Sequence, residues 1–301
     1  MINSNLRKIR NIGIMAHIDV GKTTFTERLL FITGKQHNIG EVHDGNTTMD
    51  WIIQEQEHGI TITSAATSTS WKTDLFTDVQ FNVIDIPGHI DFTAEVEKSL
   101  HILDGAVIIL DVNAGVEFQT EMIRRQANKH AIPRIIFCNK MDKTGSDYFI
   151  SSNSLIDKLS IKTIITTNTN WYTIRIPWII DVVNMKAVYW NQNGKDLTYS
   201  IMNIPNEYKN VDNEQRRLLV DSILEFDHNK ITTCLRCNKL DSHSIISLIR
   251  LATISGKALP IMCGNTLKNK VIQPVLDVIV NYLPSPDDRQ PVRDSLLTNW
   301  F

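Results

Sequence analysis

The stretch NIGIMAHIDVGKTT, residues 11–24, decides the fold of this chain. It contains a short apolar strand at 11–15, a Gly-Lys-Thr turn, and the start of an apolar-periodic helix at 23–32 that ends before Gly34. A turn of this kind, between a strand and a helix, presents backbone N–H groups and the helix N-terminus to an anion. The stretch therefore predicts a phosphate-binding loop in an α/β fold.

The residues of this loop are Ala16, His17, Ile18, Asp19, Val20, Gly21, Lys22, Thr23 and Thr24. We expect Lys22 to reach the β- and γ-phosphates of a nucleotide and the Thr23 hydroxyl to bind Mg²⁺. The strict form of the motif has glycine where this chain has Ala16. A fortuitous Gly-Lys-Thr helix start remains the alternative for this motif taken alone.

A second motif, Asp85-Ile86-Pro87-Gly88-His89, comes at the end of another apolar strand. Asp85 is suited to touch Mg²⁺ through a water molecule, and the Gly88 N–H is suited to sense a γ-phosphate. His89 could orient the attacking water, and a solvated or packed loop histidine is the alternative for that residue.

A third motif, Asn139-Lys140-Met141-Asp142, directly follows a strand that ends at Cys138. An ionised Asp142 accepts two hydrogen bonds from guanine, from N1–H and from the exocyclic amino group, and adenine offers neither donor. A charge-assisted bond is worth roughly 1.5–3 kcal/mol, so the loss of two discriminates by about 10²–10⁴. The motif favours GTP over ATP, with Asn139 supporting the loop and the Lys140 stem over the ring. An ordinary strand-to-helix turn is the alternative.

The stretch GITIT, residues 59–63, closes a long polar loop that begins at Lys35. Thr61 is suited to complete the Mg²⁺ shell only when a γ-phosphate is present. We therefore expect this loop to be ordered by GTP and to relax after hydrolysis.

Strands and helices alternate through the first half of the chain. The predicted strands are 11–15, 61–71, 79–84, 105–111 and 133–138, and the predicted helices are 23–32, 91–103 and 119–130. This rhythm predicts an α/β fold with a doubly wound, mostly parallel sheet. Together with the order and spacing of the three motifs, it predicts a P-loop GTPase fold. In such a sheet the three motifs lie at the carboxyl ends of neighbouring strands, where ligands bind.

The rhythm changes after Asp142. Residues 161–199 alternate in a way that predicts an antiparallel sheet, and helices are predicted near 213–225 and 242–254. A strand at 259–263 and a helix at 271–282 then resume the first pattern. We expect a GTPase core at 1–148, an inserted α+β subdomain at 149–258, the last core strand and helix at 259–284, and a linker or the start of a further domain at 285–301.

Composition excludes several classes of protein. The 301 residues include 31 Lys and Arg against 33 Asp and Glu, for a net charge of −2, so bulk charge does not hold nucleic acid. Four cysteines cannot form a disulfide scaffold in a chain of this length and fit a reducing compartment. No apolar run approaches the roughly 18–20 residues that span a bilayer, so we expect no membrane partner.

These segments resemble elongation factor G, a translational GTPase of bacteria and organelles. The resemblance is carried by RNIGIMAHIDVGKTTFTERLLF (10–31), TMDWIIQEQEHGITITSAAT (48–67), the stretch from Asp85 to Tyr148, and LPIMCGNTLKNKVIQPVLDVIVNYLPSP (259–286). It implies that Thr23 and Thr61 bind Mg²⁺, with Asp85 acting through water, and that GTP and GDP are the nucleotides. It also implies that His89 places the water that attacks GTP. The residues implied to back the guanine base are Gly264, Asn265, Thr266 and Leu267.

The chain departs from the family pattern in three places. Ile86 stands where the family usually has threonine, and Gly264-Asn265-Thr266 replaces the usual Gly-Ser-Ala. The family also carries several domains after the GTPase part, whereas this chain stops at Phe301. We therefore expect either a fragment or isoform of a longer protein, or a GTP-binding product without ribosome-driven turnover.

Within the family, LPSPDDR (283–289), KHAIPRIIFCNKMDKTG (129–145) and GEVHDGNT (40–47) are most similar to the mitochondrial paralogue that splits ribosomes after termination. The translocase of mitochondria or bacteria is the alternative. The resemblance implies a monomer that acts at the factor-binding site of the large ribosomal subunit, on rRNA and protein, together with ribosome recycling factor. It implies the mitochondrial matrix, with a bacterial-type cytoplasm as the alternative. The basic segment 1–11 is faintly transit-peptide-like, and we expect most of any presequence to be absent or cleaved.

Overall fold

The computed structural model describes residues 5–41, 45, 47–50, 52, 54–55, 61–73, 76–88, 92–168, 178–190, 198–226 and 240–289. Seven strands form the main sheet, in the order β2-β3-β1-β4-β5-β11-β6. Their bounds are β1 Ile9–Ala16, β2 Ala65–Trp71, β3 Val79–Asp85, β4 Gly105–Asp111, β5 Arg134–Asn139, β6 Lys162–Ile165 and β11 Ala258–Cys263. Every neighbouring pair is parallel except β2 with β3. The mostly parallel sheet predicted from the alternating pattern is thus confirmed.

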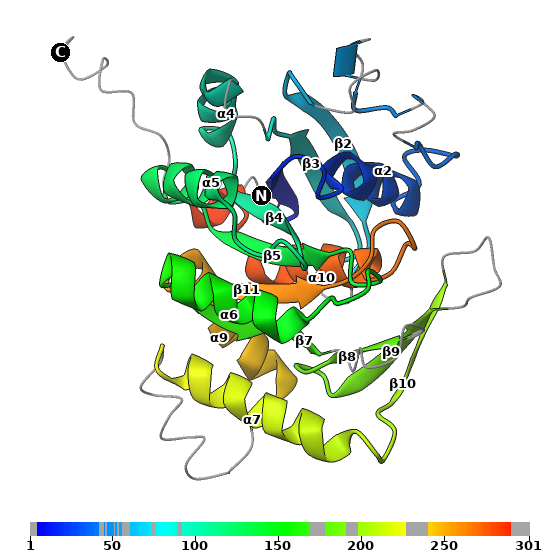
Figure 1. Cartoon of the computed structure of the whole chain (residues 1–301), viewed down its shortest axis with the longest axis vertical. Coiled ribbons are helices and arrows are strands. Elements are labelled where there is room, and N and C mark those ends of the chain that lie inside the picture. The colour runs from blue at the N-terminus through cyan, green and yellow to red at the C-terminus, as the bar shows by residue number, and fades with distance from the viewer. Residues whose placement is uncertain are drawn as a thin grey trace.

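Helices cover both faces of this sheet (Figure 1). Their bounds are α2 Lys22–Ile32, α4 Thr93–Leu100, α5 Phe118–Lys129, α6 Tyr148–Leu159, α9 Ser242–Ile254 and α10 Ile272–Tyr282. The side chains of β4 alternate between the two layers: Val107 and Ile109 lie in the core that α2, α9 and α10 cover, and Ile108 and Leu110 in the core under α4, α5 and α6. Both faces of β4 are buried, which explains why its sequence is an unbroken apolar run.

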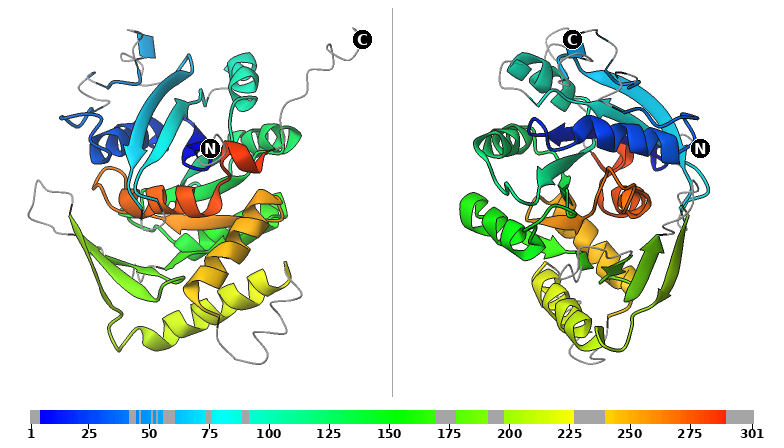
Figure 2. Two further views of the ribbon diagram at one scale, coloured as in Figure 1. Left: turned by 180° about the vertical axis from the view of Figure 1, so that it is seen from behind. Right: turned by 45° about the vertical axis from the view of Figure 1, so that its right-hand side comes forward.

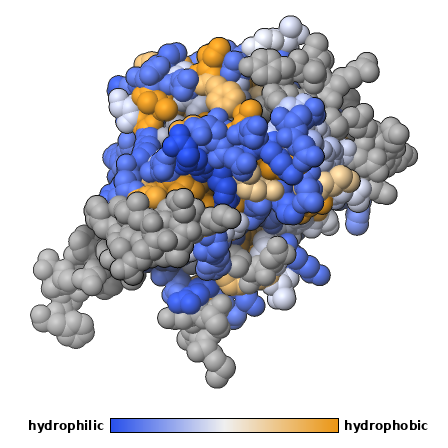
Figure 3. Space-filling model, turned by 90° about the horizontal axis from the view of Figure 1, so that it is seen from below, coloured by the Kyte–Doolittle hydropathy of each residue, from blue (hydrophilic) through white to orange (hydrophobic). Residues whose placement is uncertain are grey.

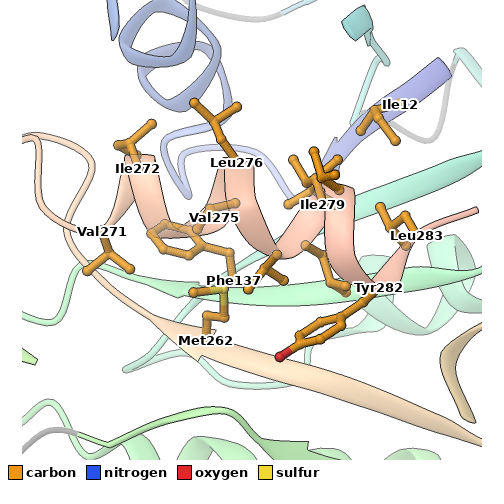
Figure 4. Close-up of a cluster of buried hydrophobic side chains, with 14 of the residues drawn as sticks. Ile12, Phe137, Met262, Val271, Ile272, Val275, Leu276, Ile279, Tyr282 and Leu283 are labelled. Carbon is orange, nitrogen blue, oxygen red and sulfur yellow. The ribbon is translucent and has the colours of Figure 1, made fainter. Parts of the chain in front are cut away.

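The helix α10 shows how the sheet holds its covering layer. Val275, Leu276 and Ile279 are fully buried or nearly so. They share one apolar core with Phe137 of β5 and Met262 of β11 (Figure 4). Because β5 and β11 each end in a candidate binding motif, this packing holds the two motifs in one rigid layer.

A second sheet lies beside the main one, with the strand order β10-β9-β8-β7 (Figure 2). Its strands are β7 Thr167–Asn168, β8 Trp178–Asp181, β9 Lys186–Trp190 and β10 Tyr199–Asn203, and all are antiparallel to their neighbours. The helix α7, Lys209–Leu224, contacts α9. Seen from below, the described surface is mostly hydrophilic, with apolar side chains between the polar ones (Figure 3).

The prediction of one antiparallel sheet over 161–199 is wrong at its start. β6 is parallel to β11 and forms the edge of the main sheet, with Ala258 opposite Lys162 and Ile261 opposite Ile165. β7 follows one residue later but pairs in the second sheet. A short strand rich in Thr and Ile can pair in either orientation, and only its neighbours decide which. The division of the chain into core and inserted subdomain stays a prediction.

Other predicted elements differ from the structure mainly at their ends. The predicted strand at 61–71 is shorter, since β2 begins at Ala65, and the helix predicted at 91–103 is α4, Thr93–Leu100. The helix predicted at 213–225 begins four residues earlier, at Lys209, and the strand at 133–138 is shifted by one residue. The 3₁₀ helix η3, Pro286–Asp288, follows α10. None of the described helices has the length and apolar character needed to cross a membrane.

Candidate functional site

The predicted motifs gather at the carboxyl ends of β1, β3, β5 and β11. β1 pairs with β3 on one side and with β4 on the other, so the chain order of the strands reverses at β1. A crevice for a ligand forms at such a switch point, outside the carboxyl ends of the strands. The loop that follows β1 is therefore central to the site.

The backbone of this loop requires glycine at position 21. Gly21 precedes α2 with φ 92°, a left-handed conformation that side chains rarely adopt. A Cβ on Gly21 would also lie 2.7 Å from Asn139 Nδ2. The tight turn therefore lets the loop after β1 approach the motif after β5.

Lys22 joins the first two motifs. Its Nζ lies 2.9 Å from Asp85 Oδ1 and donates to Thr61 Oγ1 at 2.7 Å. The Thr61 hydroxyl in turn lies 3.4 Å from Asp50 Oδ1 and 3.5 Å from Asp85 Oδ2. All four side chains are buried. The structure thus brings together the lysine, the strand-end aspartate and the loop threonine that the sequence singled out.

Two carboxyl groups share this buried cluster. Burial raises the pKa of Asp50 to about 6, and the neighbouring Asp85 adds to the rise against the opposing charge of Lys22. Burial likewise raises the pKa of Asp85, which is fully buried, while Lys22 opposes the shift. The single positive charge of Lys22 does not balance the charge of two ionised carboxylates. The cluster is therefore suited to bind a further cation.

The donors present fit the Mg²⁺ that such loops hold. Thr23 and Thr61 supply hydroxyl oxygens and Asp85 a carboxylate, and Mg²⁺ prefers hard oxygen ligands together with water and substrate phosphates. Thr23 is buried at the start of α2, on the turn after Lys22. These three residues are the ones that would hold the ion.

The loop after β3 approaches the loop after β1 closely. A Cβ on Gly88 would lie 2.3 Å from the Ala16 carbonyl oxygen, a distance that real Cβ atoms do not show. Pro87 is buried, and Ile86 is 1% exposed with its side chain in the core under α4 and α5. The departure from the family at Ile86 therefore contributes to packing rather than to the surface of the site.

Asn139 ties three loops together. Its Nδ2 donates to the Val20 carbonyl at 2.8 Å and to Thr266 Oγ1 at 3.0 Å, and its Oδ1 accepts from the Thr266 N–H at 3.0 Å. Asn139 is 1% exposed. The side chain thus fixes the loop after β5 against the loop after β1 and the loop after β11.

Lys140 has a left-handed backbone conformation, with φ 63°, and its side-chain amine makes two contacts. Its Nζ donates to the Asp19 carbonyl and lies 2.9 Å from Asp111 Oδ2. Burial works to raise the pKa of Asp111, but the hydrogen bonds from Lys140 and from the Asn113 N–H outweigh it and the pKa is lowered. The Lys140 amine therefore joins the loop after β1 to the last residue of β4.

Asp142 is partly exposed at the far end of the site, and its Oδ2 lies 3.0 Å from Lys268 Nζ. Lys268 belongs to a turn after β11 in which the Lys268 N–H donates to Asn265 Oδ1 at 3.0 Å and the Lys270 N–H donates to the Asn265 carbonyl at 2.9 Å. Leu267 in the same turn is 64% exposed. The turn is held by its own hydrogen bonds, and its lysine reaches the residue expected to bind guanine.

Several other predicted residues have a place in the site without a direct role. His17 donates from Nδ1 to the Ile18 carbonyl at 2.7 Å, and its Nε2 lies 3.2 Å from Glu117 Oε2. Met141 is buried, and the Gly264 N–H donates to the Cys138 carbonyl at 2.9 Å. His89, the predicted catalytic residue, and Gly59 and Ile60 lie outside the described residues.

Sequence reasoning missed two buried glutamates that hold the polar loop. Glu55 Oε1 accepts from the N–H groups of Ile62 and Thr63 at 2.9 and 3.0 Å. Glu27 Oε1 accepts from the N–H groups of Thr48 and Met49 at 2.8 and 3.2 Å. Both glutamates are fully buried. They hold the backbone on either side of Asp50 and Thr61, and no spacing rule in the sequence signals this role.

Asp50, Asp111 and Lys268 were also missed, and for Asp111 a signal was available. Asp111 ends the predicted buried strand 105–111, and Asp85 and Asn139 directly follow two other predicted strands, so its position alone could have placed Asp111 at the site. Asp50 lies in the polar loop eleven residues before Thr61, where the sequence offers no period to interpret.

Comparisons with known proteins agree with this geometry. Residues 7–285 match the family model described as the elongation factor Tu GTP binding domain. A crystal structure of a protein from Thermus thermophilus is similar with a TM-score of 0.84 over 94% of this chain, at 24% sequence identity, and the match spans 41% of the Thermus chain. This likeness shows a shared fold, and the chain spans less than half the length of that protein. Because the family model covers most of the chain, this protein belongs to the elongation factor Tu GTP-binding domain family, the GTPase domain of translation factors.

Proposed function

We propose that this chain binds GTP with Mg²⁺ and hydrolyses it to GDP and phosphate while acting on the ribosome. One observation carries the proposal: Asn139 hydrogen-bonds to Val20 and Thr266, and so joins the loop that ends in Lys22 to the two loops that flank Asp142. These bonds support the proposal because they hold the lysine proposed to bind phosphate and the carboxylate proposed to bind guanine on loops that are tied together. The family match supports the same activity.

The residues divide the work by their positions. Lys22 and the N–H groups at the start of α2 bind the phosphates, and Asp142 accepts hydrogen bonds from guanine. Thr23, Thr61 and Asp85 hold Mg²⁺, which when bound neutralises charge on the β- and γ-phosphates. The Gly88 N–H senses the γ-phosphate, and His89 orients the attacking water. Since Lys22 already contacts Thr61 and Asp85, GTP binding has to redistribute those contacts.

Within translation, we propose a role in ribosome disassembly after termination, in the mitochondrial matrix and together with ribosome recycling factor. The sequence resemblance of 283–289 and 129–145 supports this branch of the family. Translocation, in mitochondria or in bacterial-type cytoplasm, is the alternative, because the GTPase domain is common to both jobs.

The nucleotide assignment is tested by titration of the purified chain with GTP and ATP in Mg²⁺. We expect GTP to bind and ATP to bind about 10²–10⁴-fold more weakly, because Asp142 pairs with donors that only guanine has. Asp142→Ala removes this preference. Asp147→Ala, which alters the N-cap of α6 but not the site, is the control. Equal GTP affinity in Asp142→Ala and the parent would show that the base assignment is wrong.

Phosphate release with and without ribosomes tests the proposed place of action. Strong stimulation by ribosomes supports a ribosome-activated GTPase. GTP binding without any stimulation supports the second candidate, a GTP-binding product that ribosomes do not activate.

A further inference from the structure

The ion pair between Lys268 and Asp142 occupies the carboxylate that guanine needs. Lys268 Nζ lies 3.0 Å from Asp142 Oδ2, with Lys268 51% and Asp142 25% exposed. The ammonium takes a lone-pair site on Oδ2, and guanine N1–H and its amino group together use both carboxylate oxygens, Oδ2 included. The pair and a bound guanine therefore compete for one carboxylate.

The backbone around Lys268 is fixed, so its side chain is the part that can move. Besides its internal hydrogen bonds, the turn is attached to β5 through the Thr266 N–H and Asn139 Oδ1 at 3.0 Å. The Asn269 N–H also donates to the Thr266 carbonyl at 3.0 Å, and Asn265 is 2% exposed. A rigid turn with one long, half-exposed lysine can release the carboxylate by rotating the lysine into solvent, without disturbing the loop that backs the base.

Two other lysines near Asp142, Lys140 and Lys143, contact a different carboxylate. Lys140 pairs with Asp111 and with the Asp19 carbonyl, and Lys143 Nζ lies 3.4 Å from Asp111 Oδ2. Burial and the charge of Lys268 lower the pKa of Lys270, and Asp142 opposes that shift. Lys268 forms an ion pair with Asp142 directly.

We propose that Lys268 is a built-in competitor of guanine: it holds Asp142 in the nucleotide-free protein and must be displaced before the base can dock. This inference rests on the proposed GTP-binding function and adds a residue that sets the rate of nucleotide entry. Lys268 acts before binding, so it slows association of GDP and GTP and leaves dissociation unchanged. Because the pair is partly exposed, its effect is modest and is screened by salt.

The test is stopped-flow binding of fluorescent GDP to the parent chain and to Lys268→Met. We expect the association rate constant to rise about twofold to fivefold at low ionic strength, with an unchanged dissociation rate constant. The ratio of the association rate constants of Lys268→Met and the parent should fall toward one at about 0.5 M salt. Lys268→Arg keeps the ion pair and should bind at the parent rate.

Two controls isolate the ion pair from simple loss of charge. Lys143→Met removes the same charge from a side chain of nearly the same exposure, 53%, that pairs with Asp111 instead. The Lys143→Met variant therefore measures how the loss of one positive charge changes the long-range attraction of the nucleotide phosphates. It should not raise the association rate constant. Asp142→Asn is suited to xanthine, since its amide accepts from N1–H and donates to the C2 carbonyl. In that background Lys268→Met should leave the association rate of xanthosine diphosphate unchanged.

A slower association or a faster dissociation in Lys268→Met would show that Lys268 attracts or holds the nucleotide, which would overturn the inference. An association rate equal to that of the parent would overturn it as well. A parent chain that binds no guanine nucleotide would instead refute the proposed function. Thermal melts of each variant check that the half-exposed substitutions leave the fold intact.

Discussion

Lys22 Nζ lies 2.9 Å from Asp85 Oδ1, with Lys22 9% and Asp85 0% exposed. The lysine expected to bind phosphate and the aspartate expected to face Mg²⁺ thus neutralise each other in the protein alone. Loss of either partner would leave the other charge buried without its counter-charge. The contact joins the first residue of α2, which follows the loop after β1, to the last residue of the neighbouring strand β3.

Lys22→Met should destabilise the nucleotide-free protein by about 3–5 kcal/mol, because it leaves the carboxyl of Asp85 buried without its cation. Lys98→Met is the matched control, since Lys98 pairs with Glu95 at 2.7 Å on the exposed face of α4. That exposed pair should be worth about 0–1 kcal/mol. Urea unfolding without nucleotide measures both free energies. Equal losses in the two variants would contradict the claim that the Lys22–Asp85 pair is structural.

Asp50→Asn should stabilise the protein at neutral pH in the absence of nucleotide and Mg²⁺. Burial raises the pKa of Asp50 to about 6 from an ordinary value of 3.8, so the unfolded chain ionises first as the pH rises. The stability that the protonated carboxyl confers is present below about pH 4 and is lost between about pH 4 and 6, to a total of about 3 kcal/mol. The gain in Asp50→Asn should therefore appear at pH 7.5 and vanish near pH 4.

Urea unfolding at the two pH values measures this effect, with Asp157→Asn on the exposed face of α6 as the control. The control should change stability by less than about 0.5 kcal/mol at either pH. A gain in Asp50→Asn that is independent of pH would mean that the substitution acts through packing and not through the charge of Asp50.

Gly21→Ala and Gly34→Ala separate backbone strain from crowding at the site. Both glycines have positive φ, 92° and 74°, so each alanine should cost about 1–2 kcal/mol of stability. Nothing lies within 4 Å of a Cβ on Gly34, whereas a Cβ on Gly21 meets Asn139 Nδ2 at 2.7 Å. Gly21→Ala should therefore also weaken GDP binding by about tenfold or more, from loss of a hydrogen bond worth about 1.5 kcal/mol. Unchanged affinity in Gly21→Ala, measured by calorimetry, would refute the linking role of Asn139.

Glu55→Ala should reduce the preference for GTP over GDP. Glu55 accepts hydrogen bonds from Ile62 and Thr63, and their loss frees the backbone next to Thr61. Ordering a more mobile Thr61 when the γ-phosphate binds costs more conformational entropy. The affinity for GTP should therefore fall about threefold to thirtyfold, and the affinity for GDP should change little. Gln54→Ala changes the exposed neighbour and serves as the control. An equal loss of affinity for GTP and GDP in Glu55→Ala would show that Glu55 does not affect how Thr61 responds to the γ-phosphate.

The local sequence pattern predicted the bounds of an element correctly where the element's own residues or its cap determine its ends. The strand 105–111 has the bounds predicted from the sequence, because it is buried on both faces and its apolar run ends where the burial of the sheet ends. The helix 242–254 also has its predicted bounds, since Asp241 caps its start by accepting from the Ser244 N–H at 3.3 Å. In both cases the residues that set the ends are those of the element itself or its immediate cap.

The local sequence pattern did not predict the structure where the pairing of a strand with distant strands decides which sheet it joins. β6 and β7 are separated by a single residue, yet one extends the parallel sheet beside β11 and the other lies in the antiparallel sheet beside β8. The buried acceptors Glu27 and Glu55 were missed for a similar reason. Their partners are 21 and 22 residues away for Glu27 and seven and eight residues away for Glu55, and no local period marks such pairs.

The sequence by itself determined the class of fold, the three motifs and the expected preference for guanine, because these depend on residue types at short spacings and on the ends of apolar strands. Only the tertiary structure showed that Asn139 joins three loops, that Asp50 lies with Lys22 and Asp85, and that Lys268 reaches Asp142. Such contacts join residues far apart in the chain, and a parallel sheet brings them together only when its strand order and packing are set.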